Sequence, residues 1–307
     1  MNGKPRSLLG IEPLSAPEIL DYLTLARKMD PAKPRTTLRG RRVALLFYEN
    51  STRTRTSFEI AAKALGATTV VILASSTSVE KGESLKDTGL TLRSIVDAIV
   101  VRHPSSGSPN LLARILDIPI INAGDGMHEH PSQGLLDAFT ILQHKKTLKG
   151  LKIVTVGDIF HSRVARSDAQ LFSKLGAQVV FCGPDVLLPD TATALASNIT
   201  IERDMEKAIR GADVVMMLRV QQERLAGLAI NVDEYIRRYQ ITAAKLSLAK
   251  KDAILMHPGP MIRGMEMTDE VADGPQSVVL EQVLNGVKVR MAILESLLGS
   301  KKKGGRR

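Results

Sequence analysis

The sequence predicts an α/β protein with two doubly wound domains, in which helices flank mostly parallel sheets and the C-terminal helix returns to the first domain. Three observations support this prediction. The chain has 307 residues, enough for two domains that each bury a core. Short β-rich runs alternate with longer amphipathic patterns, as in βαβ units. Several of the short runs are apolar throughout, which favours strands covered on both faces.

The elements of the first half follow from this alternation. The short apolar runs predict strands at 43–48, 69–73, 98–101 and 119–122. The amphipathic stretches that come after them predict helices at 57–65, 85–95, 109–116 and 134–144.

The second half repeats the pattern. Strands are predicted at 152–156, 178–181, 213–218 and 253–256, and helices at 164–175 and 205–209. The last pattern, at 277–298, predicts one long helix. Its length leads us to expect that it leaves the second domain and packs on the first.

The polar, basic segment KKTLKG at 145–150 separates the two halves, so we predict the domain joint there. The first domain would span 1–147 and include the C-terminal helix at about 285–300. The second domain would span 148–284. Residues 301–307, KKKGGRR, have the composition of a disordered basic tail.

The charge of the chain lies at its ends. The sequence holds 42 Lys and Arg against 32 Asp and Glu, a net charge of +10. Residues 1–42 hold nine basic and four acidic side chains, the tail holds five basic ones, and residues 43–300 hold 28 of each sign. Clustered cations favour nucleic acids or anionic membranes, but this body is neutral. A nucleic-acid-binding or scaffolding protein that uses the basic ends is the alternative from another functional class.

Other classes of protein are excluded more directly. Cys182 is the single cysteine, so neither an internal disulfide nor a cysteine metal cluster is expected. No apolar run approaches the ~20 residues of a membrane span, and Glu12, Pro13 and Pro17 interrupt the apolar stretch near the N-terminus. We expect a soluble, cytoplasmic protein that binds neither nucleic acid nor membrane.

The segment Ser51-Thr52-Arg53-Thr54-Arg55 follows the first predicted strand and leads into a helix. A helix N-terminus offers free backbone N–H groups and a partial positive charge. Hydroxyls and guanidinium groups added there predict a phosphate site without a glycine-rich loop. Ordinary capping is the simpler alternative, but it accounts for one hydroxyl rather than five consecutive anion-binding side chains.

Polar side chains also follow neighbouring strands. Arg102 ends the third strand and His130 follows the fourth, as Arg53 follows the first. Ligands of an open parallel sheet bind beyond the carboxyl ends of its strands, so these three groups can converge. Structured turns are the alternative for His103 and His128. A metal site at 128–130 is disfavoured because alternate residues of an extended chain point to opposite sides.

Arginines stand at strand ends in the second half too. The segment 157–167 lies where a dinucleotide fingerprint would lie, yet it lacks G-x-G-x-x-G. Arg163 stands where the next helix begins, and Arg219 ends the strand at 213–218. A strand-end arginine is sometimes only a solvated charge. Arginines at strand ends of both domains, however, favour the hypothesis that they bind an anionic ligand in a cleft between the domains. The polar loop 74–87 is either a surface loop, a lid or an intersubunit arm.

These motifs together resemble the aspartate/ornithine carbamoyltransferase family from about residue 8 to residue 298. The resemblance is carried by STRTR at 51–55, KGE at 81–83, RHP at 102–104, NAGDG at 122–126, HPSQ at 130–133, RVQQER at 219–224 and HPGP at 257–260. Ornithine enzymes of the family typically show a Ser-Met-Gly loop and a His-Cys-Leu-Pro segment. RVQQER and HPGP stand in those places here, as in the aspartate enzymes.

The resemblance implies transfer of a carbamoyl group from carbamoyl phosphate to L-aspartate, an early step of pyrimidine synthesis, without a cofactor or metal. It implies a homotrimer with shared active sites, and it leaves regulatory or dihydroorotase-type partner chains open. The carbamoyl phosphate-binding residues would be Ser51, Thr52, Arg53, Thr54, Arg102, His130, Gln133, Gly259 and Pro260. The L-aspartate-binding residues would be Lys81, from a neighbouring subunit, Arg163, Arg219 and Gln221.

The chemistry fits these roles. Attack of an amine on the carbamoyl carbon makes an oxyanion, and Thr54, Arg102 and His130 would be the catalytic donors that stabilise it. The departing phosphate would take the amine proton. The nearest alternative is a carbamoyltransferase for ornithine or an acylated ornithine. Two arginines favour a dicarboxylate, because an arginine would repel the second ammonium of ornithine.

Overall fold

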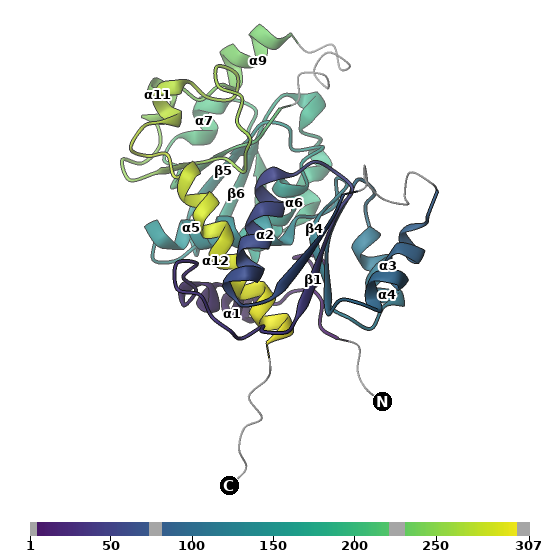
Figure 1. The fold of residues 1–307 in the computed structure, drawn as a ribbon. Coiled ribbons are helices and arrows are strands. Elements are labelled where there is room, and N and C mark those ends of the chain that lie inside the picture. Colours follow the sequence, from purple (N-terminus) through teal and green to yellow (C-terminus); the bar gives the residue numbers. More distant parts are fainter. Residues whose placement is uncertain (1–4, 74–81, 221–230, 300–307) are drawn as a thin grey trace. The chain divides into compact units, whose positions relative to one another are not determined.

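The computed structural model describes residues 5–73, 82–220 and 231–299, and it contains two separate parallel sheets (Figure 1). The chain divides into two units. Unit 1 comprises Met1–Gly10, Leu20–Ser132 and Gly286–Arg307, and unit 2 comprises Ile11–Ile19 and Gln133–Asn285. One division lies between Gly10 and Ile11, and the other three fall inside helices α1 (Ala16–Arg27), α5 (Pro131–His144) and α12 (Val279–Leu298). Two α/β units and a C-terminal helix whose second part belongs to unit 1 confirm the predicted fold class.

The sheet of unit 1 has the strand order β2-β1-β3-β4, with every neighbouring pair parallel. Its strands are β1 (Arg42–Phe47), β2 (Thr68–Leu73), β3 (Ala98–His103) and β4 (Ile120–Asp125). Its helices include α2 (Thr52–Ala64), α3 (Leu85–Arg93) and α4 (Ser108–Ile115). Because the strands are parallel, the segments that follow β1, β3 and β4 all leave the same edge of the sheet.

Helices cover both faces of this sheet. Figure 1 shows α3 and α4 on one face and α2 on the other. Alternate residues of β1 and β3, such as Leu46 and Ile99, share a buried cluster with Leu92 of α3 and Leu112 of α4. On the other side, the Arg290 guanidinium of α12 lies 5.2 Å from the centre of the Phe58 ring of α2. Burial on both faces explains why these strands are apolar throughout.

The sheet of unit 2 has the strand order β7-β6-β5-β8-β9, again parallel at every pair. Its strands are β5 (Lys152–Val156), β6 (Gln178–Cys182), β7 (Ile199–Ile201), β8 (Val214–Met217) and β9 (Ile254–Met256). Its helices are α6 (Arg163–Lys174), α7 (Met205–Ile209), α9 (Val232–Tyr239), α10 (Ala243–Leu246) and α11 (Asp269–Ala272), with 3₁₀ turns η3 (Asp185–Leu187) and η4 (Asp190–Leu195).

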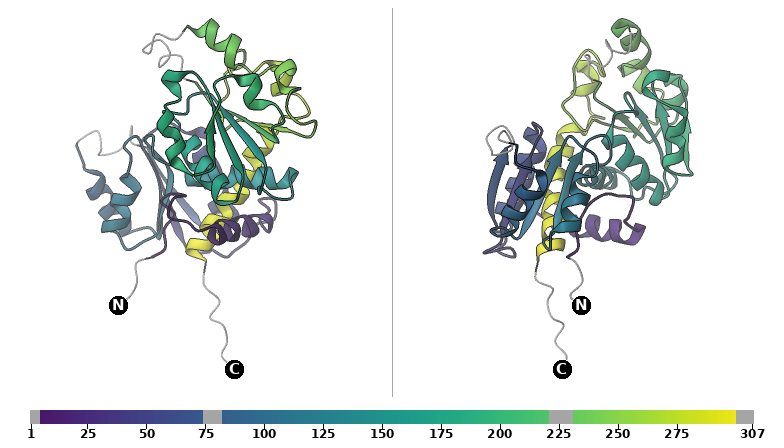
Figure 2. Two further views of the ribbon diagram at one scale, coloured as in Figure 1. Left: turned by 180° about the vertical axis from the view of Figure 1, so that it is seen from behind. Right: turned by 90° about the vertical axis from the view of Figure 1, so that its right-hand side faces the viewer.

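One face of this second sheet carries a large apolar core. Val156, Val215 and Leu255 pack there with Tyr235 of α9 and other residues of α7, α10 and α11. The left view of Figure 2 shows helices on either side of the strands. Three neighbouring strands, β5, β8 and β9, therefore end side by side at one edge. The segments that follow these strand ends contain Arg163 after β5, Arg219 after β8 and His257 after β9.

The structure corrects several predicted elements. Helix α2 starts at Thr52, five residues earlier than predicted, so most of the Ser51–Arg55 segment lies inside the helix. Helix α1 is absent from the prediction, in which Pro17 counts only as an interruption of the apolar stretch near the N-terminus. Pro17 stands at the second helical position, where proline is tolerated, and Ser15 and Glu18 exchange the hydrogen bonds of a capping box. The elements β7, α10 and α11 have only three or four residues, too few for periodicity to reveal, and the eight-residue helix α9 is absent from the prediction as well.

None of the helices in the described part of the chain combines the length and the apolar character that a membrane crossing requires.

The core of unit 2 gives a test of this packing with two matched leucines. Leu255 in β9 is fully buried, whereas Leu280 in α12 is 84% exposed. We expect Leu255→Ala to lower the free energy of unfolding by about 2–5 kcal/mol through lost burial and a cavity. Leu280→Ala should change it by less than about 0.5 kcal/mol. Urea denaturation followed by circular dichroism measures both, and equal effects would contradict the placement of β9 in the core.

Candidate functional site

The first turn of α2 carries the predicted phosphate-binding segment. Ser51 is the N-cap residue, and its side chain makes no capping hydrogen bond. Thr52 and Arg53 are exposed, whereas Thr54 is buried. The Ser57 hydroxyl donates to the Arg53 carbonyl at 2.7 Å and also contacts that of Thr54, which fixes this turn from within the helix. The first backbone N–H groups of any helix lack an acceptor within the helix, and such groups at a helix N-terminus suit an anion.

Arg102 lies at the same edge of the unit 1 sheet. It pairs with Phe47, the last residue of β1, in the strand register, and its Nε donates to Oε2 of Glu49 at 2.9 Å. The guanidinium is largely buried, so the carboxylate compensates its charge and fixes its plane. Glu49 was not among the predicted residues, although its place directly after a strand, two residues before Ser51, was a usable signal.

His130 lies directly before α5 and is 4% exposed. The Ser132 hydroxyl is 3.5 Å from its Nδ1, at the limit of a hydrogen bond. Because β4 is the neighbour of β3, the segment that leads from β4 to His130 leaves the same sheet edge as Arg102 and the start of α2. Unit 1 therefore brings Ser51–Thr54, Arg102 and His130 to one edge, as the sequence predicts.

The other two histidines of this region have structural partners. Nδ1 of His103 accepts from the Ser105 N–H at 2.9 Å, and burial lowers the pKa of this imidazole. Nδ1 of His128 lies 3.0 Å from the buried carboxylate of Asp125. These contacts agree with the structured-turn interpretation of both residues.

In unit 2, Arg163 is the first residue of α6. The preceding Ser162 caps this helix, with its hydroxyl accepting from the Ala165 N–H at 3.1 Å. Asp158, buried after β5, accepts from the backbone N–H of His161 at 3.1 Å and contacts its Nδ1 at 2.9 Å. The turn between β5 and α6 is therefore held by internal hydrogen bonds, and it places Arg163 at the sheet edge.

Arg219 lies two residues beyond β8 and is exposed, while the next residue, Val220, is fully buried. The Val220 N–H donates to Oε1 of Glu266 at 3.0 Å. Glu266 is itself buried, and its other oxygen accepts from the Ile262 N–H and lies 3.6 Å from Nε2 of His257. One buried carboxylate therefore anchors both the Arg219 segment and the turn that follows β9.

That turn contains Gly259 and Pro260, which are joined by a cis peptide bond. The Gly259 N–H donates to Nδ1 of His257 at 2.8 Å, so the neutral ring carries its proton on Nε2, on the side of Glu266. Gly259 has a φ of 71°, in the left-handed region that glycine adopts without strain.

Gln133, on the first turn of α5, is 7% exposed and donates from Nε2 to the carboxylate of Asp137.

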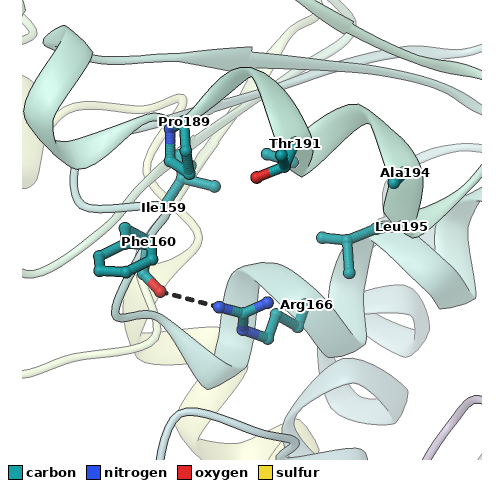
Figure 3. Close-up of a pocket in the computed structure, with 8 residues that line it drawn as sticks. Ile159, Phe160, Arg166, Pro189, Thr191, Ala194 and Leu195 are labelled. Atoms are coloured by element: carbon teal, nitrogen blue, oxygen red, sulfur yellow. Dashed lines mark hydrogen bonds between the residues drawn. The ribbon is translucent and has the colours of Figure 1, made fainter.

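Unit 2 also has a pocket of about 170 Å³ near the start of α6. None of the predicted site residues that the structure describes lines it. Figure 3 shows Ile159 and Phe160 on one side of it, residues of η4 on the other, and the Arg166 guanidinium donating to the Phe160 carbonyl at 2.9 Å. Two predicted residues, Lys81 and Gln221, lie outside the described residues.

Glu266 and Gln282 are contributors that sequence reasoning missed. No local pattern distinguishes them, because each acts on a backbone N–H of a segment distant in sequence. Asp137 was also missed, although an acid four residues after Gln133 in an otherwise apolar stretch of helix was a signal.

The environment of Cys182 predicts an unreactive thiol. The residue is fully buried in β6, and burial raises the pKa of its thiol to about 12, with Glu202 adding to the shift. At pH 8 roughly one thiol in ten thousand is then ionised, and only the thiolate is nucleophilic. Ellman's reagent should leave the native protein unmodified for minutes and should titrate one thiol per chain in guanidinium chloride. Rapid modification of the native protein would contradict this.

Comparisons with known proteins agree on a family. A family model described as "Aspartate/ornithine carbamoyltransferase, carbamoyl-P binding domain" matches residues 6–143. One described as "Aspartate/ornithine carbamoyltransferase, Asp/Orn binding domain" matches residues 149–297. The aspartate carbamoyltransferase catalytic subunit of Koribacter versatilis is 66% identical over 296 residues, which cover 96% of this chain and 98% of that one.

Solved structures give the same result for the fold. The ornithine carbamoyltransferase of Pyrococcus furiosus has a TM-score of 0.89 at 32% identity, covering 97% of this chain and 99% of that chain. Aspartate transcarbamoylase of Trypanosoma cruzi, in complex with carbamoyl aspartate and phosphate, has a TM-score of 0.87 at 32% identity, covering 96% and 97%. Because the matches extend over both halves of the sequence, the chain belongs to the aspartate/ornithine carbamoyltransferase family.

Proposed function

We propose that this protein transfers the carbamoyl group of carbamoyl phosphate to L-aspartate, giving N-carbamoyl-L-aspartate and phosphate in de novo pyrimidine synthesis. The observation that carries the proposal is the 66% identity to an aspartate carbamoyltransferase catalytic subunit across 96% of the chain. The fold alone does not choose the acceptor, because an ornithine enzyme and an aspartate enzyme are both about equally similar at 32% identity.

The acceptor-side residues support the choice of aspartate. Arg163 and Arg219 follow strands of unit 2, and each guanidinium can bind a carboxylate through two parallel N–H donors. Aspartate carries two carboxylates, which match two such groups. Ornithine carries a second ammonium, which the same arginines repel. Gln221 would support this site.

Unit 1 holds the donors suited to carbamoyl phosphate. The N-terminus of α2 with Ser51, Thr52 and Arg53 would bind the phosphate. Arg102 would bridge the phosphate and the carbonyl oxygen, and its pairing with Glu49 through Nε orients the rest of the guanidinium. Gln133 and the backbone at Gly259 and Pro260 would bind the carbamoyl NH₂.

The reaction then needs no covalent intermediate. The aspartate amine attacks the carbamoyl carbon, a C–N bond forms, and the C–O bond to phosphate breaks. Thr54, Arg102 and His130 stabilise the oxyanion formed on the way, and one such donor is worth ~10²–10³ in rate. The departing phosphate takes the proton from the amine, so no protein base is required.

The domain assignment forms part of the proposal. The carbamoyl phosphate-binding domain would be 1–147 with the C-terminal helix at about 285–300, and the aspartate-binding domain would be 148–284. The ranges of the two family models support this division. A cytoplasmic location is supported by the single cysteine of the sequence.

An acceptor assay tests the specificity. A colorimetric assay for the ureido product, with carbamoyl phosphate and either aspartate or ornithine, should give product from aspartate. Arg219→Met should lower kcat/KM for aspartate by about 10²-fold, because an unpaired carboxylate is costly to bind. Arg210→Met, which removes another exposed arginine of unit 2, is the matched control and should leave activity unchanged. Product from ornithine but not aspartate would overturn the proposal.

We further propose a homotrimer in which Lys81 enters the active site of a neighbouring subunit. Lys81→Ala and His130→Ala should each lower turnover strongly without abolishing it. In trimers formed by coexpressing the two variants, about one quarter of sites combine an intact His130 with an intact Lys81 from the neighbour. Activity should then recover to about a quarter of the wild-type value per chain. Additive residual activity alone, with a trimer confirmed by light scattering, would exclude sharing.

A further inference from the structure

A buried polar network in unit 2 connects Gln133 to the turn at 257–260. Gln133 Nε2 donates to both oxygens of Asp137 at 3.1 Å, and Gln282 Nε2 donates to Oδ1 of the same carboxylate at 2.7 Å. Oε1 of Gln282 accepts from the backbone N–H of His257 at 2.9 Å. Gln133, Asp137 and Gln282 are at most 7% exposed. The network therefore joins helices α5 and α12 to the segment after β9.

The carboxylate of Asp137 fixes which way the Gln133 amide faces. A carboxylate only accepts hydrogen bonds, so the NH₂ end of the amide must point at it. A flipped amide would place Oε1 against two carboxylate oxygens. Oε1 of Gln133 is thereby held facing away from Asp137, where it can serve only as an acceptor.

A second buried carboxyl group is the neighbour of Asp137. Asp168 of α6 lies beside it, where α5 and α6 approach so closely that a Cβ at Gly134 would be 3.4 Å from Asp168 Oδ1. Burial raises the pKa of Asp168 well above its usual value, and the neighbouring Asp137 carboxyl group raises that pKa further. The raised pKa favours the neutral form of Asp168, and two glutamine amides donate hydrogen bonds to Asp137, as a buried carboxylate requires.

The turn after β9 is left with acceptors alone. The His257 N–H is taken by Gln282 and the Gly259 N–H by the His257 ring, while Pro258 and Pro260 have no N–H. What the backbone at 257–260 can offer a ligand is therefore its carbonyl oxygens. The turn and Gln133 Oε1 share the same polarity, and both suit a ligand group that donates N–H.

We propose that Asp137 and Gln282 are positioning residues that make the site selective for a carbamoyl NH₂ over a methyl group of the same size. Asp137 holds the Gln133 amide with its oxygen outward, and Gln282 occupies the one N–H of the turn that could otherwise repel a donor. The inference rests on the proposed function, because it assigns the selectivity of that same carbamoyl phosphate site.

Acetyl phosphate is the probe, since it replaces the NH₂ of carbamoyl phosphate by CH₃. Kd values for carbamoyl phosphate, acetyl phosphate and inorganic phosphate are measured by calorimetry for the wild-type protein and Asp137→Asn. Asparagine can accept from or donate to Gln133, so the amide is free to flip. The selectivity for carbamoyl over acetyl phosphate should fall about tenfold, the effect of roughly one hydrogen bond. Kd for inorganic phosphate should stay within about twofold.

The same variant separates positioning from folding. The Asp137→Asn substitution removes one member of a buried carboxyl pair, so Tm should be unchanged or higher even though selectivity falls. A folded Asp137→Asn protein that retains the wild-type selectivity would overturn the inference.

A second pair of variants tests Gln282 against a matched control. Asn285 lies one turn further along α12, is equally buried, and donates to Thr140 of α5 at 3.0 Å, but it does not contact the turn. Gln282→Met and Asn285→Leu each remove one polar link between the same two helices. Only Gln282→Met should lower the selectivity for carbamoyl phosphate. Equal loss in both variants would show that helix packing alone is involved and would overturn the assignment of Gln282.

The wild-type protein distinguishes this failure from that of the proposed function. A wild-type protein that forms no carbamoyl product from aspartate or that does not bind carbamoyl phosphate overturns the proposed function itself. If the wild-type protein forms the product, and Asp137→Asn and Gln282→Met both keep the wild-type selectivity, only the positioning roles are overturned.

Discussion

The carboxylate of Asp137 accepts hydrogen bonds from two glutamine side chains that stand far apart in sequence, Gln133 and Gln282. A charge buried to this degree is tolerated only when each of its lone pairs is used. Its partners are therefore fixed in place, and they fix in turn the first turn of α5 and the backbone after β9. Together with Glu266, which holds the Arg219 segment, Asp137 anchors the polar groups that follow the strands of unit 2.

The two units differ in the polarity that they present. Unit 1 brings together donors, namely guanidinium groups, hydroxyls and the N–H groups of a helix start. The turn at 257–260 in unit 2 presents acceptors, because its N–H groups are occupied or absent. Carbamoyl phosphate has a matching division, with acceptor oxygens on the phosphate and carbonyl and donors only on its NH₂. Under the proposed function, recognition of such a small molecule would depend on sorting donors from acceptors, since its apolar surface is too small to contribute.

The strands and the strand-end arginines were predictable because both follow from local pattern. Arg102, Arg163 and Arg219 each follow an apolar run, and within each of the two sheets parallel pairing brings such positions to one edge. The start of α2 was misplaced by five residues, because threonine and arginine carry no apolar periodicity there. Glu266 and Gln282 were not predictable. Their partners are backbone N–H groups 46 and 25 residues away, and a single sequence holds no record of such contacts.

The division of the chain inside α1, α5 and α12 limits how such a protein can evolve by recombination. Neither unit is a continuous stretch of sequence, so neither can be exchanged between relatives by a single recombination event in a loop. A break at the division in α5 would fall between Ser132 and Gln133. It would therefore separate His130 from Gln133, which is only three residues away. Under the proposed function, a new acceptor specificity would therefore be more accessible through point changes near Arg163 and Arg219 than through replacement of a whole half.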